Sequence, residues 1–485
     1  MLKDRRLWAI LILGAAVRLF GLGDRSLSYD ECQQFWASRG NPLISNREIT
    51  LDPPLFAAML RVHALASRSE LWLRLLPCLF GILAIPAVAG LARAASGDAT
   101  TALLAALFTA LAPYPIRYSQ SLRVYALTLL MCALLPGAYL AARKTGGIRE
   151  WARTGILACA ALLTMYGAVW ILLAMGILSV SDWLRRAPGA ARGVLAVVGA
   201  AAGALPFYLA SLPAQMSHGT PAAFYEDKFL PAGGILTGLR FLARATLELW
   251  SYLSFIHPAA GLLFGGLAAA GGVFLLRRPD GRIPVLLFLL SVTGAAAASM
   301  LRLYPYGGTR QMLFAGPLFF VLVAAGVAGL RPAARGISVP AFAAALLAGA
   351  GIFLYRYHTE PAGQEMRPVL RSLERRSTPG DRILVNKDAI PQFRFYYRGS
   401  SDRVVLGRET VIWDYVPEVN RILGSDPSER WWLVFSHGWS ADRRAELARV
   451  DRRFRPGERI EAHHAGAYLF VPVADLSGGA GSPPP

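Results

Sequence analysis

The chain has 485 residues, 54% of them hydrophobic, and a formal net charge of +19. This composition is too apolar for an ordinary soluble globular protein, and the chain is too long for a single domain. We therefore expect a polytopic membrane protein. The charge is concentrated in residues 1–356, which hold 31 Lys and Arg against 14 Asp and Glu, whereas residues 357–485 hold 19 against 17. Since these basic residues lie in short loops between apolar runs, membrane orientation and anionic lipid headgroups account for them, and we expect no nucleic-acid partner.

Apolar runs near the length of a bilayer crossing recur through residues 1–356 and predict a transmembrane domain of about eleven α-helical membrane segments. Residues 154–182 are expected to form a hairpin of two short helices, because both flanks are basic and should share one side of the membrane. The other expected segments are 7–23, 72–92, 99–117, 121–142, 192–212, 258–276, 282–302, 310–330 and 336–356.

Basic loops predict the orientation of these segments, since cytoplasmic loops carry an excess of Lys and Arg. We therefore expect a multi-pass protein of the inner (plasma) membrane with a cytoplasmic N-terminus. The active site and the C-terminal domain are then extracytoplasmic. Residues 235–256 then stay outside. They mix Arg240, Arg244 and Glu248 with apolar residues at helical spacing, which favours an interfacial helix, with a true span as the alternative.

The first outer loop, residues 24–71, carries two adjacent carboxylates, Asp30 and Glu31, soon after the first span. A carboxylate held at the lipid boundary is partly desolvated, which raises its affinity for a proton and suits it to act as a general base. The alternative is an ordinary helix start whose acids face solvent. Later in the loop, Asp52 precedes Pro53-Pro54, and it either belongs to a functional site or merely caps the following helix.

A polar run at the outer junction of the third and fourth spans, residues 117–127, holds Tyr118, Arg123 and Tyr125. Such side chains are costly at that depth unless they face protein or a polar cavity, which favours a functional site. A second polar stretch ends in Arg310 on the outer side of the tenth segment, against the orientation bias. Arg310 either snorkels to the surface or binds an anion, and its forked donors match phosphate.

Residues 357–477 predict a small extracytoplasmic α/β domain with ordinary charge and polarity, and 478–485 are expected to be disordered. The expected elements are a helix at 364–376, a turn at Pro379-Gly380-Asp381, strands at 383–385, 431–435 and 468–473, and a helix at 441–450.

Together these motifs resemble the integral-membrane glycosyltransferases of the GT-C superfamily, in the family 39-like branch of protein O-mannosyltransferases and aminoarabinose transferases. The resemblance covers nearly the whole chain in order. It rests on the acidic pair, the Pro-Pro-Leu motif, the YSQ-x-x-R-x-Y-A-L run from Tyr118, the arginine at position 310, and the P-G-D-x-x-L-V sequence from Pro379.

The resemblance implies transfer of a sugar from a polyprenyl-phosphate donor to a lipid, polysaccharide or protein acceptor on the periplasmic, extracytoplasmic face, without a cofactor or metal. Asp30 would be the catalytic base, supported by Glu31. Candidate contacts to the donor phosphate are Arg123, Arg310, Arg117, Lys228 and Arg61. Candidate substrate-binding residues are Tyr29, Asp52, Tyr118, Gln120, Tyr125, Tyr306 and His218.

Two positions depart from the family pattern. Asp52 stands where relatives often have a basic residue or His, and Ser121 replaces the usual acid after YSQ. These departures leave open a catalytically inactive scaffold of the same fold. A lipid or polysaccharide transporter or flippase is a further alternative, although it would be expected to show interrupted helices in matching halves of the chain.

Overall fold

The computed structural model describes residues 4–40, 52–217, 222–330, 338–360, 363–409, 415–436 and 446–473. By their contacts these residues form two compact units. The first comprises Met1–Leu22 and Ala37–His358, and the second comprises Gly23–Trp36 and Thr359–Pro485. The segment Gly23–Trp36, here called the acid segment because it contains Asp30 and Glu31, therefore groups with the C-terminal residues, whereas we had expected it within the transmembrane domain.

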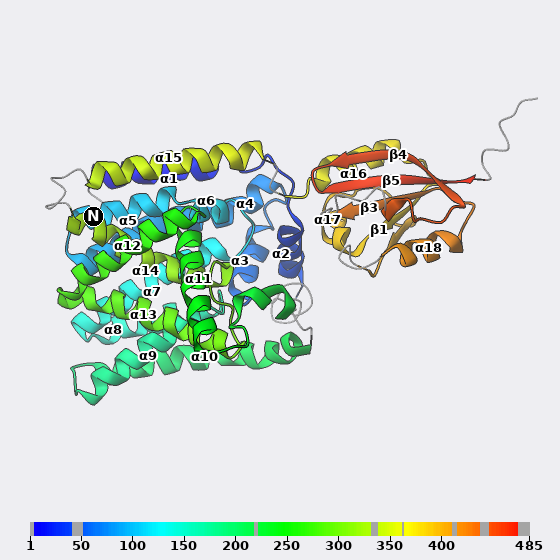
Figure 1. Cartoon of the computed structure of the whole chain (residues 1–485). Coiled ribbons are helices and arrows are strands. Elements are labelled where there is room, and N and C mark those ends of the chain that lie inside the picture. Colours follow the sequence, from blue (N-terminus) through cyan, green and yellow to red (C-terminus); the bar gives the residue numbers. More distant parts are fainter. Residues whose placement is uncertain are drawn as a thin grey trace, which may run out of the picture. The chain divides into compact units, whose positions relative to one another are not determined.

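The first unit is built from helices that pack side by side (Figure 1). Within the described residues, seven helices are long and apolar enough to cross a membrane, or eight spans if α5 and α6 count as one. The helices of the chain before the C-terminal domain are α1 (Arg5–Leu19), α2 (Tyr29–Arg39, which contributes to both units), α3 (Leu55–His63), α4 (Glu70–Ser96), α5 (Ala99–Leu111), α6 (Pro113–Ser119), α7 (Tyr125–Thr145), α8 (Ile148–Leu162), α9 (Ala168–Leu184), α10 (Ala190–Ser217), η2 (Ala222–Lys228), α11 (Ile235–Leu253), α12 (Pro258–Leu276), α13 (Pro279–Met300), η3 (Arg310–Ala315), α14 (Gly316–Leu330) and α15 (Ser338–Thr359).

Each segment predicted from the sequence has a helical counterpart, so the polytopic helical fold is confirmed. The expected short hairpin corresponds to α8 and α9, which have 15 and 17 residues. Helix α1 is also shorter than predicted, with 15 residues. At about 1.5 Å per residue, none of these three reaches the ~30 Å of a hydrocarbon core by itself.

Helix α11 corresponds to the predicted interfacial helix at 235–256. Phe241, Ala245 and Leu249 are buried along one face at four-residue spacing, while Arg240 and Arg244 are exposed. This two-faced pattern is typical of a helix at a water–lipid or water–protein boundary. Helix α11 is not among the described helices that pass the length and hydropathy criteria for a span.

The second unit contains a five-stranded sheet in the order β2-β1-β3-β5-β4, whose first three strands are parallel and whose remaining neighbours are antiparallel (Figure 1). The mixed sheet confirms the predicted α/β domain. Its elements are α16 (Met366–Arg376), β1 (Arg382–Val385), η4 (Lys387–Ala389), α17 (Ile390–Tyr396), β2 (Val404–Leu406), α18 (Val416–Ser425), β3 (Trp431–Ser436), β4 (Phe454–Ala462) and β5 (Ala465–Pro472).

Both faces of this sheet are covered, which explains why all of β3 is buried. Trp432 and Val434 face a core formed with α16 and α17, whereas Trp431, Leu433 and Phe435 face a core formed with α18. Alternate residues of a strand point to opposite faces, so a continuous apolar run is what a doubly covered strand requires.

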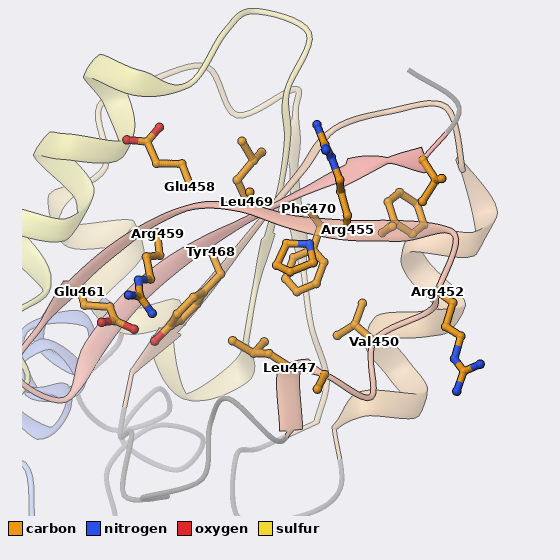
Figure 2. Close-up of a pocket in the computed structure, with 15 residues that line it drawn as sticks. Leu447, Val450, Arg452, Arg455, Glu458, Arg459, Glu461, Tyr468, Leu469 and Phe470 are labelled. Carbon is orange, nitrogen blue, oxygen red and sulfur yellow. The ribbon is translucent and has the colours of Figure 1, made fainter. Parts of the chain in front are cut away.

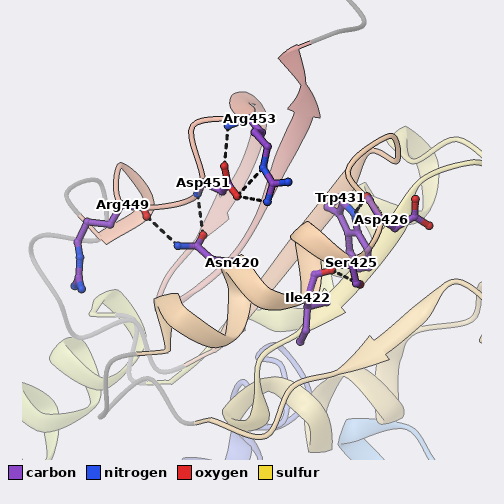
Figure 3. A network of polar contacts seen from close by, with 8 residues as sticks. All are labelled: Asn420, Ile422, Ser425, Asp426, Trp431, Arg449, Asp451 and Arg453. Carbon is purple, nitrogen blue, oxygen red and sulfur yellow. Dashed lines mark hydrogen bonds and ion pairs between the residues drawn. The ribbon is translucent and has the colours of Figure 1, made fainter.

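Polar contacts hold α18 in place at the edge of the second core (Figure 3). Asn420 donates to the carbonyl of Arg449 at 3.3 Å and accepts from the backbone N–H of Asp451 at 2.8 Å. The indole N–H of Trp431 donates to the carbonyl of Asp426 at 3.3 Å.

The predicted helix at 364–376 and strands at 383–385, 431–435 and 468–473 correspond to α16, β1, β3 and β5. Helices α17 and α18 and strands β2 and β4 were not predicted. Most of the expected helix at 441–450 and the terminal 478–485 lie outside the described residues.

Candidate functional site

The polar run of residues 117–127 is placed by a sharp break between α5 and α6, which are bent by 56°. Ala112 is extended with ψ 141°, and the following Pro113 disfavours a helical residue before it. The guanidinium of Arg18 donates to the carbonyls of Thr109 (2.7 Å) and Ala110 (2.9 Å) at the end of α5. These bonds satisfy the carbonyls that the break leaves without helical partners.

Two further contacts hold α6 against α1. Arg18 also donates to the hydroxyl of Ser119 at 3.1 Å, within α6. The side-chain amide of Gln120 donates to the carbonyls of Val17, Arg18 and Phe20, the nearest at 2.8 Å. These bonds cap the end of α1, and the expected binding of substrate by Gln120 stays a prediction.

Arg123 lies in the turn between α6 and α7 and is 8% exposed. Its guanidinium forms an ion pair with Asp52 at 3.2 Å and lies 3.4 Å from the hydroxyl of Tyr125. The guanidinium carbon lies 5.6 Å from the centre of the Tyr125 ring, which adds a cation–π contact. Asp52, which departs from the family pattern in the sequence, therefore has a defined partner.

Tyr118 and Arg310 extend this group. The rings of Tyr118 and Tyr125 lie 4.4 Å apart, and the hydroxyl of Tyr118 lies 2.6 Å from that of Tyr252. The charges of Arg123, Arg310 and Asp52 all act on Tyr125. We call Asp52, Tyr118, Arg123, Tyr125 and Arg310 the arginine–tyrosine cluster. The cluster contains two guanidinium groups, whose forked donors match the geometry of phosphate and carboxylate ligands.

Lys228 already has acidic partners. Its ammonium forms ion pairs with Asp227 at 2.8 Å and Glu248 at 2.9 Å. Burial opposes the charged form of Lys228, but these two carboxylates outweigh it, so the pKa of Lys228 is raised. Tyr306 lies beside this group, with its hydroxyl 2.8 Å from Thr246 and its N–H bonded to the carbonyl of Lys228. Lys228 is therefore a charged group paired with two carboxylates, and its contact with the donor phosphate stays a prediction.

The remaining predicted residues of the first unit are two exposed arginines and one histidine. Arg117 is exposed on α6. Arg61 is exposed on α3 and donates to the carbonyl of Gly40 at 2.8 Å. His218 lies outside the described residues.

The acidic pair lies in the first turn of α2, in the second unit. The carboxylate of Glu31 accepts the backbone N–H of Ser28 at 2.9 Å, and the Ser28 hydroxyl lies 3.4 Å from the N–H of Glu31. This reciprocal arrangement is a capping box, whose Ser-x-x-Glu signature is legible at 28–31 although we did not use it. Glu31 is 4% exposed and Asp30 is partly exposed.

Tyr29, a predicted substrate-binding residue, precedes the acidic pair. Burial raises the pKa of its phenol to about 12, with Asp388 and Asp30 acting in the same direction, so this phenol stays neutral at physiological pH.

An apolar pocket of about 600 Å³ opens in the C-terminal domain over β4 and β5 (Figure 2). Leu447, Val450 and Phe470 contribute apolar contact, while Arg455 and Glu458 are among its charged lining residues. None of the residues singled out from the sequence lines this pocket. Among the described residues, no group of three or more His, Cys, Asp or Glu could hold a metal ion.

No protein-family model matches this chain, and no curated protein sequence does. Solved structures do match. The apo structure of ArnT from Cupriavidus metallidurans aligns with a TM-score of 0.60 and 14% identity over 95% of this chain and 97% of that one. ArnT bound to undecaprenyl phosphate aligns with a TM-score of 0.58 and 14% identity over the same shares. The oligosaccharyltransferase of Archaeoglobus fulgidus, in complex with Zn and sulfate, aligns with a TM-score of 0.55 and 13% identity over 96% of this chain and 73% of that one.

ArnT, an aminoarabinose transferase, and the archaeal oligosaccharyltransferase are both membrane glycosyltransferases of the GT-C superfamily. The alignments extend over nearly the whole chain, including both compact units. At 12–14% identity they establish architecture, which agrees with the resemblance of the sequence motifs. The chain therefore has the fold of the GT-C membrane glycosyltransferases.

Proposed function

We propose that this protein is a membrane glycosyltransferase that moves a sugar from a polyprenyl-phosphate-linked donor to an acceptor on the extracytoplasmic face. The observation that carries the proposal is the alignment with ArnT over 95% of this chain and 97% of that one. An ArnT structure contains undecaprenyl phosphate, and an archaeal oligosaccharyltransferase structure contains a dolichol-phosphate with an inhibitory peptide. These ligands support the class of donor and leave a lipid, a polysaccharide and a protein as candidate acceptors.

In the proposed reaction, Asp30 is the general base. It takes the proton of an acceptor hydroxyl while the oxygen attacks the anomeric carbon of the sugar. The bond between this carbon and the carrier phosphate breaks, and the phosphate departs with the bonding electrons. Asp30 is partly exposed in the first turn of α2, so an acceptor hydroxyl can approach its carboxylate.

The arginine–tyrosine cluster is the proposed binding site for the carrier phosphate. The charges of Arg123 and Arg310 would stabilise the negative charge that builds up on the phosphate as it leaves. Asp52 holds the Arg123 guanidinium in one direction through their ion pair. Fixed donors are more effective than mobile ones, because they need little reorganisation when the charge develops.

The test is Asp30→Asn in purified protein with a radiolabelled polyprenyl-phosphate sugar. A general base contributes about 10²- to 10⁴-fold to the rate, so transfer should fall by that factor while donor affinity stays unchanged. The matched control is Asp24→Asn, an exposed acid of the same segment, which should keep full activity. Full activity of Asp30→Asn would end the assignment of the base.

Arg310→Ala tests the phosphate site separately. Donor affinity should fall because a guanidinium that contacts phosphate is lost, while acceptor affinity should change little. Equal donor affinity in the variant and the parent protein would remove Arg310 from the site.

The arrangement of the helices does not favour the alternative of a transporter. A transporter would be expected to show interrupted helices in both halves of the chain, whereas among the described helices one pair, α5 and α6, is sharply bent.

A further inference from the structure

Side chains of the C-terminal domain bind the backbone of the acid segment just before Asp30. The N–H and hydroxyl of Ser26 donate to Glu365 at 3.2 and 2.8 Å. The N–H of Leu27 donates to the hydroxyl of Tyr396 at 2.5 Å, and the N–H of Tyr29 donates to the side-chain oxygen of Gln364 at 3.1 Å. Three backbone donors within four residues are thus fixed by side chains distant in the sequence.

Gln392 makes the most buried of these connections and is fully buried. Its amide nitrogen donates to the carbonyl of Leu27 at 2.8 Å, and its amide oxygen accepts from the hydroxyl of Ser436 at 2.6 Å. Ser436 is itself buried and ends β3. A buried amide with both ends bonded has one low-energy orientation, so the carbonyl of Leu27 is held in a fixed position relative to the end of β3.

The position of these contacts in the sheet is informative. Strand β1 lies between its parallel neighbours β2 and β3, so the chain leaves β1 in one direction and later returns on its other side. Sheets of this kind bind ligands outside the carboxyl ends of the strands at such a reversal. Here Ser436, at the carboxyl end of β3, and Gln392, in the helix after β1, bind the protein's own acid segment.

Helix α17 also binds the acid segment on the far side of Asp30. The indole N–H of Trp36 donates to the carbonyl of Pro391 at 3.0 Å. The rings of Phe35 and Phe395 meet edge to face, 5.0 Å apart. The residues before and after Asp30 are therefore both anchored to the same short helix.

We propose that the C-terminal domain positions Asp30 for catalysis, and that Gln392 is the central positioning residue. This inference rests on the proposed role of Asp30 as the base. The domain supplies no reacting group in this scheme. It fixes the backbone on both sides of the carboxylate, and small displacements of a reacting group lower a rate steeply.

The experiment uses Gln392→Met in the full-length protein, since methionine has a similar length and forms neither hydrogen bond. Amide hydrogen exchange of residues 26–31 should accelerate about tenfold or more, because the hydrogen bond that anchors Leu27 is lost. The kcat of transfer should fall about tenfold or more at an unchanged KM for the donor. Ser436→Ala, which removes the remote end of the connection, should shift both quantities in the same direction by less.

The matched control is Ile422→Val in α18, which removes one methylene from the core on the other face of the sheet. It costs stability comparable to one hydrogen bond and contacts neither Gln392 nor the acid segment by any described hydrogen bond. Its exchange at residues 26–31 and its kcat should equal those of the parent protein.

Three results would overturn the inference. One is unchanged exchange at residues 26–31 in both Gln392→Met and Ser436→Ala. Another is faster exchange with full kcat, which would show that anchoring does not matter for turnover. The third is an equal loss of kcat in Ile422→Val, which would assign the effect to general destabilisation. An active Asp30→Asn enzyme would instead overturn the proposed function, and the exchange data would still report whether Gln392 anchors the segment.

Discussion

At the scale of single residues, Asp52 illustrates how a departure from a family pattern can be compensated by a neighbour. An acid where relatives often carry a basic residue raises the question of lost phosphate binding. The ion pair gives the acid a defined partner in Arg123, and we expect Asp52 to orient this guanidinium.

Substitution of Asp52 separates orientation from charge. Asp52→Ala should raise the donor KM about tenfold or more, since a hydrogen bond to a charged group is worth about 1.5–3 kcal/mol. Asp52→Asn keeps a side-chain oxygen that accepts from Arg123, so its KM should rise less. Steady-state kinetics with varied donor distinguish the two, and equal effects would mean that the charge of Asp52 matters more than the direction it gives to Arg123.

Glu31 presents a second choice between roles at the residue scale. If its main task is the capping box with Ser28, Glu31→Gln should keep near-normal kcat because glutamine provides the same acceptor. Glu31→Ala should destabilise α2 by about 1 kcal/mol, as loss of a helix cap does. Thermal unfolding and kcat are measured on both variants. A loss of kcat as large in Glu31→Gln as in Glu31→Ala would show that the charge itself supports Asp30.

At the scale of elements, the break between α5 and α6 positions the polar run of residues 117–127, which supplies three members of the arginine–tyrosine cluster. Its geometry depends on a close approach between α4 and α6 at Gly81. A Cβ atom at this glycine would lie 1.8 Å from the hydroxyl oxygen of Ser119 and 2.7 Å from its Cβ. Rotation of the Ser119 hydroxyl cannot relieve the second contact, so α6 would have to move.

Gly81→Ala should therefore destabilise the protein by about 1–3 kcal/mol, the usual cost of overpacking, and raise the donor KM by displacing Arg123. Gly90→Ala is the control on the same helix, because no atom lies within 4 Å of its added Cβ. Alanine is favoured over glycine in a helix by about 1 kcal/mol, so this variant should be as stable as the parent or more stable. Thermal unfolding in detergent gives the comparison, and equal melting temperatures of the two variants would contradict the close contact.

At the scale of the whole molecule, the proposed orientation places the basic loops in the cytoplasm and the C-terminal domain outside it. Introduced cysteines at two exposed positions test this, Arg149→Cys in the first turn of α8 and Asp402→Cys in the C-terminal domain. A membrane-impermeant maleimide applied to intact spheroplasts should label Asp402→Cys and spare Arg149→Cys. Both variants also carry Cys159→Ser, because Cys159 is partly exposed, whereas Cys32, Cys78 and Cys132 are buried and should give little background. The opposite labelling pattern would reverse the orientation.

The helices and the main strands could be predicted because their signals are local. Apolar length predicted the membrane segments, and unbroken apolar runs predicted β1 and β3. Helices α17 and α18 were missed because they are short and begin with turn-like sequences that contain proline at Pro391 and Pro417. Strand β4 was missed because Arg455-Pro456-Gly457-Glu458 resembles a turn, although the strand tolerates it at a register shift on the sheet edge.

The amino-acid sequence by itself determined that the chain enters a membrane and where its helices run. It also identified polar residues whose transfer into lipid would cost free energy unless they face protein or a polar cavity. These properties follow from composition, period and local turn chemistry. Tertiary structure decided the partners: Asp52 with Arg123, Gln120 with the end of α1, and the acid segment with the C-terminal domain. Such pairings join residues up to 365 positions apart, and hydrogen-bond direction and close packing select them only once the helices and the sheet are assembled.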